Sequence, residues 1–504
     1  MNRSTSRWWS GVLFILACLV SHAALADTGT VTTVYAFNGG ISGPDGGTPT
    51  TGVVFGRDGN FYGTTTYGGS GSGSVFKLTP AGTETILLSF DGTNGANPSD
   101  LIQGSDGSLY GTTYWGGPNN GYGTVYKITT DGVQTVLYNF TNGGAAGTNP
   151  IVGLVEGTDG NFYGTTSGGG SSLGGTAFKI TPSGTLTVLH SFAGADGTAP
   201  RKLTLGRDGN FYGAAFQGGS GGYGTVFRIA PDGAFNVLYS FTGNPDGALP
   251  NGPLLEGSDG NFYGLTQAGG SSANCSFYLA PNCGTVYKIT PDGRETVLHS
   301  FAGSPNDGAL SDCGTCFTSA WGLVEGTDGN FYGITLQGGS YAQQNCSAGC
   351  GTLFRITPEG EETVLHSFTG PWDPPNDGWG PSGSLVETSP GVFWGTTQSG
   401  VTGWGNVFKY TAPYTGPTVT ITANPPTIRP FHSTTLTWSS SNATSCSASG
   451  AWSGAKAASG SATLYPPYGT DVYTLTCSGP GGTASASASV VVGPPPPAVT
   501  IGAW

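Results

Sequence analysis

Three of the five histidines are the side chains best suited to general acid–base chemistry in this sequence. They are His190, His299 and His366, and each occupies the same place in a recurring Leu-His-Ser-Phe phrase. Other copies of the phrase hold tyrosine or leucine there, as at Tyr239 and Leu88. A general acid or base is a single placed group, so a position that recurs with the period of the chain predicts a structural role.

Arg201 and Lys202 depart from the repeat, because neutral residues are expected at the corresponding place in the other copies. Two adjacent cations would suit a sugar acid. They support an alternative interpretation, a carbohydrate-active enzyme of the polysaccharide lyase or hydrolase class with Arg201 and Lys202 as its catalytic residues. The main prediction assigns no catalytic residue, because nothing in the sequence amounts to a catalytic signature.

Aromatic side chains in the variable loops are the main binding candidates, because exposed rings among few charges suit sugar rings. Trp372 and Trp379 carry the most weight, since they stand in the long loop 370–383 and break the repeat. Several of the others recur at one place in their copies, which equally fits packing between repeats. The remaining candidates are Trp115, Trp404, Tyr122, Tyr223 and Tyr341.

Aspartates recur in an Asp-Gly-x-x-Pro pattern or a close variant of it. Calcium prefers several oxygen ligands, so Asp196, Asp246, Asp307 and Asp377 are weak calcium candidates. Asp-Gly is also turn chemistry in itself, and we therefore expect turns and no cofactor. Four glutamates share another recurring place, where we expect a solvated rim: Glu156, Glu256, Glu325 and Glu387.

Eight cysteines follow the N-terminal leader, and an even number in an exported chain predicts four disulfides. The sequence alone leaves the connectivity open. The alternative is a metal site formed by Cys313, Cys316, Cys346 and Cys350. The simplest pairing joins Cys275 with Cys283, Cys313 with Cys316, Cys346 with Cys350, and Cys446 with Cys477.

A repeat of 48 to 53 residues must position these side chains. The phrase Asp-Gly-Asn-Phe-Tyr-Gly begins at Asp58 and recurs, with two variants, to give seven copies. Short β-branched and aromatic runs between Asp-Gly or Ser-Gly turns predict four strands per copy, A to D. In one copy these strands are expected at 153–157, 161–166, 175–181 and 187–192.

The ends of the repeat array indicate a closed ring. The last copy stops after its C strand, and an additional D-like strand at 32–37 precedes the first copy. We therefore predict an all-β protein with a seven-bladed β-propeller over residues 30–412, closed by the N-terminal strand. Phenylalanines at equivalent places are expected to pack between blades: Phe37, Phe90, Phe140, Phe192, Phe241, Phe301 and Phe368.

The Asp-Gly-Asn-Phe-Tyr-Gly-Thr-Thr and Thr-Val-Leu-His-Ser-Phe phrases resemble those of the secreted bacterial GloVer-repeat proteins. The resemblance covers about residues 30 to 412. It implies an exported, envelope-associated or extracellular protein, and it brings no reaction and no site residue with it.

The residues after the repeat form a second predicted domain. A linker at 413–417 precedes 418–492, where Thr, Ser and Val alternate around Trp438, Cys446 and Cys477. This segment resembles a bacterial immunoglobulin-like β-sandwich, although Trp438 precedes both cysteines rather than falling between them. Residues 493–504 are a Pro-rich tail.

The N-terminal residues predict where the protein acts, and the net charge limits its partners. Residues 1–26 combine Arg3 and Arg7, an apolar run and Ala24-Leu25-Ala26, which is typical of a signal peptide. An alternative is a weak lipoprotein signal ending at Cys18. We expect no transmembrane segment in the mature chain. The net charge of −13 argues against a nucleic-acid partner.

We therefore predict a secreted or cell-envelope monomer that acts as a binding or adhesion scaffold for glycans or surface partners. The A–B and C–D turns stay short, whereas the B–C and D–A loops vary in length and carry the unusual aromatics. Binding sites are usually built from variable loops on a rigid scaffold. Any site is expected on the face formed by the B–C and D–A loops, which we call the loop face.

Overall fold

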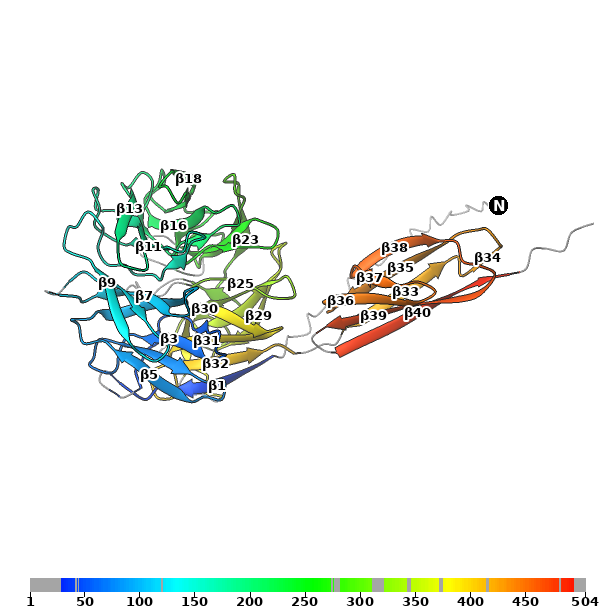
Figure 1. Ribbon diagram of the computed structural model, residues 1–504, viewed down its shortest axis with the longest axis horizontal. Helices are drawn as coiled ribbons and strands as arrows, with labels where there is room; N and C mark the ends of the chain where they lie inside the picture. The colour runs from blue at the N-terminus through cyan, green and yellow to red at the C-terminus, as the bar shows by residue number, and fades with distance from the viewer. Residues whose placement is uncertain are drawn as a thin grey trace, which may run out of the picture.

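The computed structural model describes residues 29–40, 45–118, 121–272, 282–310, 321–341, 346–370, 375–413, 417–479 and 482–493, together with Gly43 and Cys275. Within these residues the elements are β-strands, with no helix among them, so the all-β prediction is confirmed. Figure 1 shows the strands up to β32 in one rounded body and those from β33 onward in another.

The described strands of the repeat region form seven antiparallel sheets of four or five strands, here called repeat sheets 1 to 7. Repeat sheet 1 contains β2 (Val54–Phe55), β3 (Phe61–Thr65), β4 (Ser74–Leu78) and β5 (Glu84–Ser89). Repeat sheet 2 contains β6 (Ala96–Gln103), β7 (Leu109–Trp115), β8 (Thr124–Ile128) and β9 (Gln134–Asn139). Repeat sheet 3 contains β10 (Val155–Glu156), β11 (Phe162–Thr166), β12 (Thr176–Ile180) and β13 (Leu186–Ser191).

In the next two sheets the A strand is divided into two short pieces that pair with the same B strand. Repeat sheet 4 contains β14 (Thr198–Pro200), β15 (Thr204–Leu205), β16 (Phe211–Gln217), β17 (Thr225–Ile229) and β18 (Phe235–Ser240). Repeat sheet 5 contains β19 (Ala248–Pro250), β20 (Leu255–Glu256), β21 (Phe262–Ala268), β22 (Thr285–Ile289) and β23 (Glu295–Ser300).

The last two sheets complete the repeat region. Repeat sheet 6 contains β25 (Val324–Glu325), β26 (Phe331–Thr335), β28 (Thr352–Ile356) and β29 (Glu362–Ser367), and β24 (Gly308–Ala309) pairs with β27 (Gln337–Gly338) as a separate two-stranded sheet. Repeat sheet 7 contains β30 (Trp379–Ser389), β31 (Val392–Ser399), β32 (Asn406–Thr411) and β1 (Thr30–Ala36). The N-terminal β1 thus supplies the fourth strand of the last sheet, antiparallel to β32.

The Phe-Tyr pair of the repeated phrase connects each sheet to the next. In five successive pairs of sheets, a tyrosine ring lies 3.9 to 4.2 Å from the first aromatic ring of the following copy. Trp394 of repeat sheet 7 makes the equivalent contact with Phe61 of repeat sheet 1, at 4.1 Å. The last sheet therefore packs against the first.

The seven D-strand phenylalanines are almost completely buried, which confirms their predicted packing role. Each lies close to an aromatic ring on the C strand of the next sheet, as Phe192 lies 5.0 Å from Phe227. Phe37 follows β1 and contacts Phe76 of repeat sheet 1 at 5.2 Å. These phenylalanines thus join the D strand of each copy to the C strand of the next sheet.

The polar residues of the Asp-Gly-Asn-Phe-Tyr-Gly phrase stabilise the A–B turn. The Asp159 carboxylate accepts hydrogen bonds from the backbone N–H of Asn161 (3.1 Å), the Asn161 amide (2.7 Å) and the Tyr163 hydroxyl (2.9 Å). Lys179 on strand C adds an ion pair at 2.8 Å. The last glycine of the phrase lies against an aromatic ring. A Cβ at Gly164 would be 2.7 Å from Phe178.

The four glutamates expected to form a solvated rim have a further role. Glu156 accepts hydrogen bonds from the backbone N–H and hydroxyl of Ser105, in the A–B turn of the preceding copy. Glu256, Glu325 and Glu387 accept equivalent backbone bonds from the preceding A–B turns. The side chains are partly exposed, as a rim would be, but they also bind the neighbouring sheet, which the sequence did not predict.

The C-terminal part consists of two sheets around a shared core. The first contains β33 (Thr418–Asn424), β35 (Thr434–Ser441) and β38 (Ser459–Leu464). The second contains β34 (Thr427–Ile428), β36 (Ser445–Gly450), β37 (Gly454–Lys456), β39 (Gly469–Gly479) and β40 (Gly482–Val492). Leu436 and Trp438 of the first sheet pack with Tyr473 and Leu475 of the second.

Disulfides join Cys275 to Cys283, Cys346 to Cys350, and Cys446 to Cys477, as expected from neighbour pairing. Cys313 and Cys316 lie outside the described residues. The alternative four-cysteine metal site is contradicted, because the sulfur atoms of Cys346 and Cys350 are bonded to each other.

The described part of the chain contains no helix that is long and apolar enough to cross a membrane.

Candidate functional site

An open pocket of about 570 Å3 lies between the loop that precedes β6 and the loop that follows β7. Trp115, the last residue of β7, lines it with 44% of its surface exposed. Asp91 and Thr93 line it from the other loop, and the rest of the lining is glycine and alanine. The pocket therefore presents one indole ring, one carboxylate and accessible backbone.

Glycine allows the two loops to approach closely enough to form this pocket. The backbone N–H of Gly117 donates a hydrogen bond to the carbonyl oxygen of Gly92 at 2.9 Å. A Cβ at Gly116 would lie 2.6 Å from the backbone of Gly95, and Gly116 has a φ of 81°. A larger residue at position 116 would force the loops apart.

Two neighbouring tyrosines hold the Trp115 ring in place. The Trp115 ring centroid lies 4.8 Å from that of Tyr114 in an edge-to-face arrangement and 6.2 Å from that of Tyr122. Such contacts restrict the rotamers of the indole while its outer surface remains accessible. The predicted candidates Trp115 and Tyr122 are therefore brought together, with Tyr122 packed and Trp115 exposed.

Asp91 was not identified from the sequence, although it belongs to the same site. Its Oδ1 accepts hydrogen bonds from the backbone N–H (2.8 Å) and hydroxyl (2.7 Å) of Thr93. The bond from the Thr93 hydroxyl, together with that from the Asn94 backbone, holds the pKa of Asp91 below its usual value. Asp91 is therefore a charged hydrogen-bond acceptor at neutral pH.

The other predicted aromatic candidates do not share one surface site. Tyr341 is 45% exposed. Tyr223 packs against Ala248 and Leu249, and Trp404 packs in the core of repeat sheets 1 and 7, next to Tyr67. Trp379, the first residue of β30, packs against the core of the last repeat sheets, and Trp372 lies outside the described residues.

Arg201 is placed in the interior, with 3% of its surface exposed. Its guanidinium lies 4.4 Å above the ring of Phe216, and its charge also acts on Tyr114. Burial raises the pKa of the Tyr114 hydroxyl, and the Arg201 charge lowers it. The guanidinium is thus engaged by aromatic side chains rather than presented to solvent.

Lys202 forms an ion pair with Asp100, with 3.0 Å between Nζ and Oδ2. Asp100 is on β6 of repeat sheet 2, whereas Lys202 belongs to repeat sheet 4. The pair spans repeat sheet 3, whose Gly153 leaves no room for a side chain, because a Cβ there would lie 2.7 Å from Asp100. Asp100 occupies the place in its copy that Lys202 has in the fourth, so the expectation of neutral residues there was wrong.

The aspartates considered for calcium each bind the polar D-strand residue that precedes them. Asp196 lies 2.7 Å from His190, and Asp307 lies 3.0 Å from His299. Asp377 forms the same bond with His366, whereas Asp246 accepts one from the Tyr239 hydroxyl at 2.6 Å. The histidine and aspartate patterns identified separately in the sequence are therefore two halves of one contact.

Three glutamates at the start of D strands approach two of these contacts, and the similar hydrogen bond from Tyr35 to Asp45, from the next sheet. Each has one carboxylate oxygen that is buried without a hydrogen-bond partner among the described residues. Burial, followed by the charge of the facing aspartate, raises the pKa of all three to about 7. No sequence pattern pointed to these glutamates, because the contact depends on how neighbouring sheets are placed. They are Glu84, Glu295 and Glu362.

The model of the Gloeobacter/Verrucomicrobia repeat matches residues 10–156, 97–322, 154–370 and 279–443. No curated protein matches. One similar solved structure is the extracellular domain of a putative hybrid two-component system from B. thetaiotaomicron, with a TM-score of 0.43 and 12% identity over 93% of this chain and 59% of that one.

Two further structures have comparable similarity. PorZ, a surface component of the type-IX secretion system of Porphyromonas gingivalis, has a TM-score of 0.46 and 13% identity over 90% of this chain and 61% of that one. An ulvan lyase of a new polysaccharide lyase family has a TM-score of 0.43 and 10% identity over 73% of this chain and 94% of that one. The chain spans about three fifths of the length of the first two structures.

Proposed function

The chain belongs to the Gloeobacter/Verrucomicrobia repeat family, and we propose that it is an extracellular or envelope glycan-binding scaffold. The ligand is a neutral polysaccharide, and the pocket at Trp115 on the loop face is its binding site. The observation that carries the proposal is the exposed Trp115 ring beside the ionised Asp91 carboxylate.

This pair of side chains suits a sugar. The apolar face of a pyranose packs on an indole ring, while its hydroxyls donate hydrogen bonds to a carboxylate. The net charge of −13 disfavours polyanionic ligands. The disulfides support an oxidising compartment outside the cytosol.

The proposed scaffold is a seven-bladed β-propeller over residues 30–412 in which each repeat sheet is one blade. Pairing of β1 with β32 and the contact of Trp394 with Phe61 support closure of the ring. We also propose that residues 1–26 are a signal peptide, that 413–417 are a linker, and that 418–492 are an immunoglobulin-like spacer. A glycan or surface partner would then meet the loop face of a monomer.

Binding without catalysis is favoured over the lyase or hydrolase alternative. Lys202 is neutralised by Asp100, and Arg201 is 3% exposed against Phe216. Neither cation is in a position to hold the carboxylate of a sugar acid without first breaking these contacts. The experiment below distinguishes the two functions.

Affinity gel electrophoresis of the mature protein in a series of neutral and acidic polysaccharides tests the proposal. Retardation is expected in neutral polysaccharide gels, and Trp115→Ala or Asp91→Asn should weaken binding at least about tenfold. Leu173→Ala is the matched control, because Leu173 is 73% exposed in the corresponding loop of the next copy. It should bind as the wild type does.

The same samples are assayed for new reducing ends and for unsaturated products. Binding without product supports a scaffold. Product formation that is lost in Arg201→Ala would instead establish the enzyme, and equal binding by wild type and Trp115→Ala would remove the proposed site.

A further inference from the structure

Repeat sheets 5 and 6 bring one histidine and two carboxylates together. His299 is on β23, Asp307 is in the loop that follows it, and Glu362 is the first residue of β29. One potential ligand atom from each side chain lies within 4.8 Å of the other two. These residues are far from the Trp115 pocket in sequence and play no part in the proposed glycan site.

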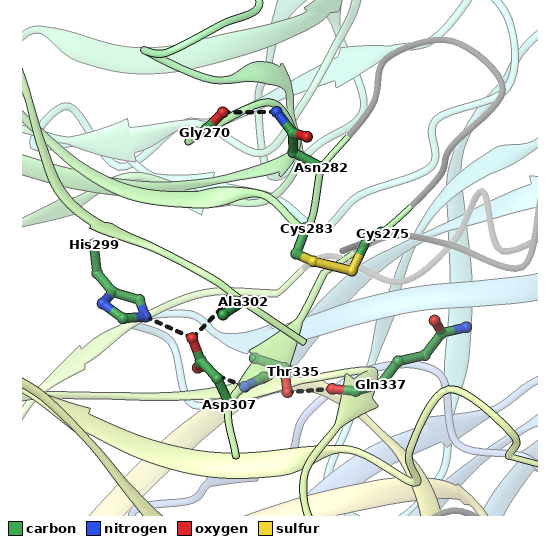
Figure 2. The surroundings of a disulfide bond; sticks show 10 residues. Gly270, Cys275, Asn282, Cys283, His299, Ala302, Asp307, Thr335 and Gln337 are labelled. Carbon is green, nitrogen blue, oxygen red and sulfur yellow. Dashed lines mark hydrogen bonds and ion pairs between the residues drawn. A yellow bond between two sulfur atoms is a disulfide. The ribbon is translucent and has the colours of Figure 1, made fainter. Parts of the chain in front are cut away.

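Backbone donors fix the orientation of the central carboxylate. Asp307 accepts hydrogen bonds from the N–H of Ala302 (2.7 Å) and of Gly308 (2.6 Å). Figure 2 shows His299 directed at the same carboxylate, with the Cys275–Cys283 disulfide nearby. Carboxylates that bind metals are commonly held by such bonds, which orient them before the ion arrives.

Glu362 completes the cluster from the neighbouring sheet. Its Oε1 is buried and accepts no hydrogen bond from the described residues. Two carboxylates that face each other in a partly buried space are stabilised by a cation between them.

The corresponding places in the other copies provide an internal comparison. Tyr35, Asp45 and Glu84 form one related set, and Tyr239, Asp246 and Glu295 form another, with a phenol in place of the imidazole. At His190 the third side chain is Phe235, whose ring stacks on the imidazole at 3.8 Å. Among the described residues, only His299, Asp307 and Glu362 combine three metal-ligating groups in this way.

We propose that His299, Asp307 and Glu362 bind one divalent transition-metal ion, with Zn2+ as the best fit. One imidazole and two carboxylates match the nitrogen and oxygen ligands of zinc, and water would complete the tetrahedron. The ion would link β23 to β29 and so fasten two neighbouring sheets.

The test uses the untagged mature protein, stripped of metal with EDTA and then dialysed. Titration with Co2+, followed by its visible absorption, and with Zn2+, followed by calorimetry, should show one site per chain. His299→Tyr and Glu362→Gln should each weaken Zn2+ binding by about 100-fold or more. Saturating Zn2+ should also raise the melting temperature of the wild type but of neither variant.

His190→Tyr is the matched control, because it makes the same substitution where Phe235 replaces the glutamate. Tyrosine already stands at the equivalent place in other copies, so both tyrosine variants are expected to fold, which circular dichroism checks. The control should bind Zn2+ as the wild type does. Absence of stoichiometric binding to the wild type, or undiminished binding by His299→Tyr or Glu362→Gln, would overturn the proposal.

Discussion

Single side chains of the repeated phrase act mainly as links within and between sheets. The sequence identified the phrase and its turn, but the partners of the aspartate depended on strand register. Tyr163 is a local partner, four residues from Asp159, whereas Lys179 lies on the C strand and contacts Asp159 only when the strands pair. The recurrence of the phrase thus reflects a stability requirement rather than a catalytic one.

Asp159→Ala should lower the free energy of unfolding by about 1–2 kcal/mol, because Asn161, Tyr163 and Lys179 lose their acceptor. Denaturant titration followed by tryptophan fluorescence measures the change. Asp131→Ala, in an exposed C–D turn, is the control and should stay within about 0.5 kcal/mol of the wild type. A similar loss in both variants would show that the Asp159 network adds nothing.

The Asp159 carboxylate also affects how the stability of the protein changes at acid pH. Burial raises the pKa of Asp159, but the bonds from Lys179 and Asn161 outweigh it and hold the pKa below the usual value. The stabilisation is present above the ordinary aspartate pKa and is lost as the pH falls toward the folded-state value. Asp159→Asn should therefore lessen the loss of thermal stability between about pH 4 and pH 2, and the rest of the loss should come from the equivalent aspartates of other copies. An unchanged acid limb would contradict this assignment.

The predicted site residues differ in their surroundings: Trp115 is exposed, whereas Arg201 is buried and Lys202 forms an ion pair. Trp115 lines the pocket as a sequence-based candidate, because a tryptophan in a variable loop is a strong local signal. Asp91 gave no such signal, since Asp-Gly is also ordinary turn chemistry. Arg201 and Lys202 were predicted to be exceptions to the repeat, but Asp100, which occupies the place equivalent to Lys202, was not.

At the scale of the elements, the expected strands agree closely with the observed ones. In the third copy, β11, β12 and β13 begin and end within one residue of the expected ranges, whereas β10 is only two residues long. Only Val155 and Glu156 pair with the B strand, whereas Gly153 lies against Asp100 of the preceding sheet. Contacts between sheets, such as those of the D-strand glutamates, cannot be derived from strand periodicity.

The D-strand glutamates Glu84, Glu295 and Glu362 lie between neighbouring sheets, and their protonation makes the stability of the protein depend on pH. The groups that face them are Tyr35 and Asp45 for Glu84, Asp246 for Glu295, and His299 and Asp307 for Glu362. Each folded-state pKa of about 7 exceeds the ordinary value of 4.5. The folded protein therefore binds more protons than the unfolded chain, and its stability falls as the pH rises through 7.

Calorimetric scans in EDTA should show the melting temperature falling between pH 5 and pH 8. The triple variant Glu84→Gln, Glu295→Gln and Glu362→Gln should lose most of this dependence. Gln134 already occupies the equivalent place in the second copy, where it hydrogen-bonds Asn94 at 3.0 Å. A wild-type melting temperature that stays constant or rises over this range would contradict the assignment.

At the scale of the whole molecule, the order of the sheets follows from the count of D strands. The sequence predicted that β1 would complete the last sheet, and β1 pairs with β32 over Thr30 to Ala36. The C-terminal segment was predicted as a second unit, and it has its own core. The path of the insertions near Cys313 and Trp372 lies outside the described residues.

Removal of residues 27–38 should destabilise the entire repeat region. It exposes the edge of β32 and removes Phe37 from its contact with Phe76. Light scattering and circular dichroism are expected to show aggregation or a melting temperature lowered by about 10 °C or more. A synthetic peptide of residues 29–38 should restore stability, and the same peptide with Phe37→Ala should not. A truncated chain as stable as the full one would contradict ring closure.

Footprinting of Trp115 tests the central claim most directly. Brief hydroxyl-radical oxidation and peptide mass spectrometry are applied to the mature protein with and without the neutral polysaccharide that retards it most in gels. Our account predicts that oxidation of Trp115 falls severalfold with polysaccharide, while that of Tyr341, also exposed, is unchanged. Bound polysaccharide that leaves Trp115 as reactive as in the free protein would contradict the assignment of this pocket as the glycan site.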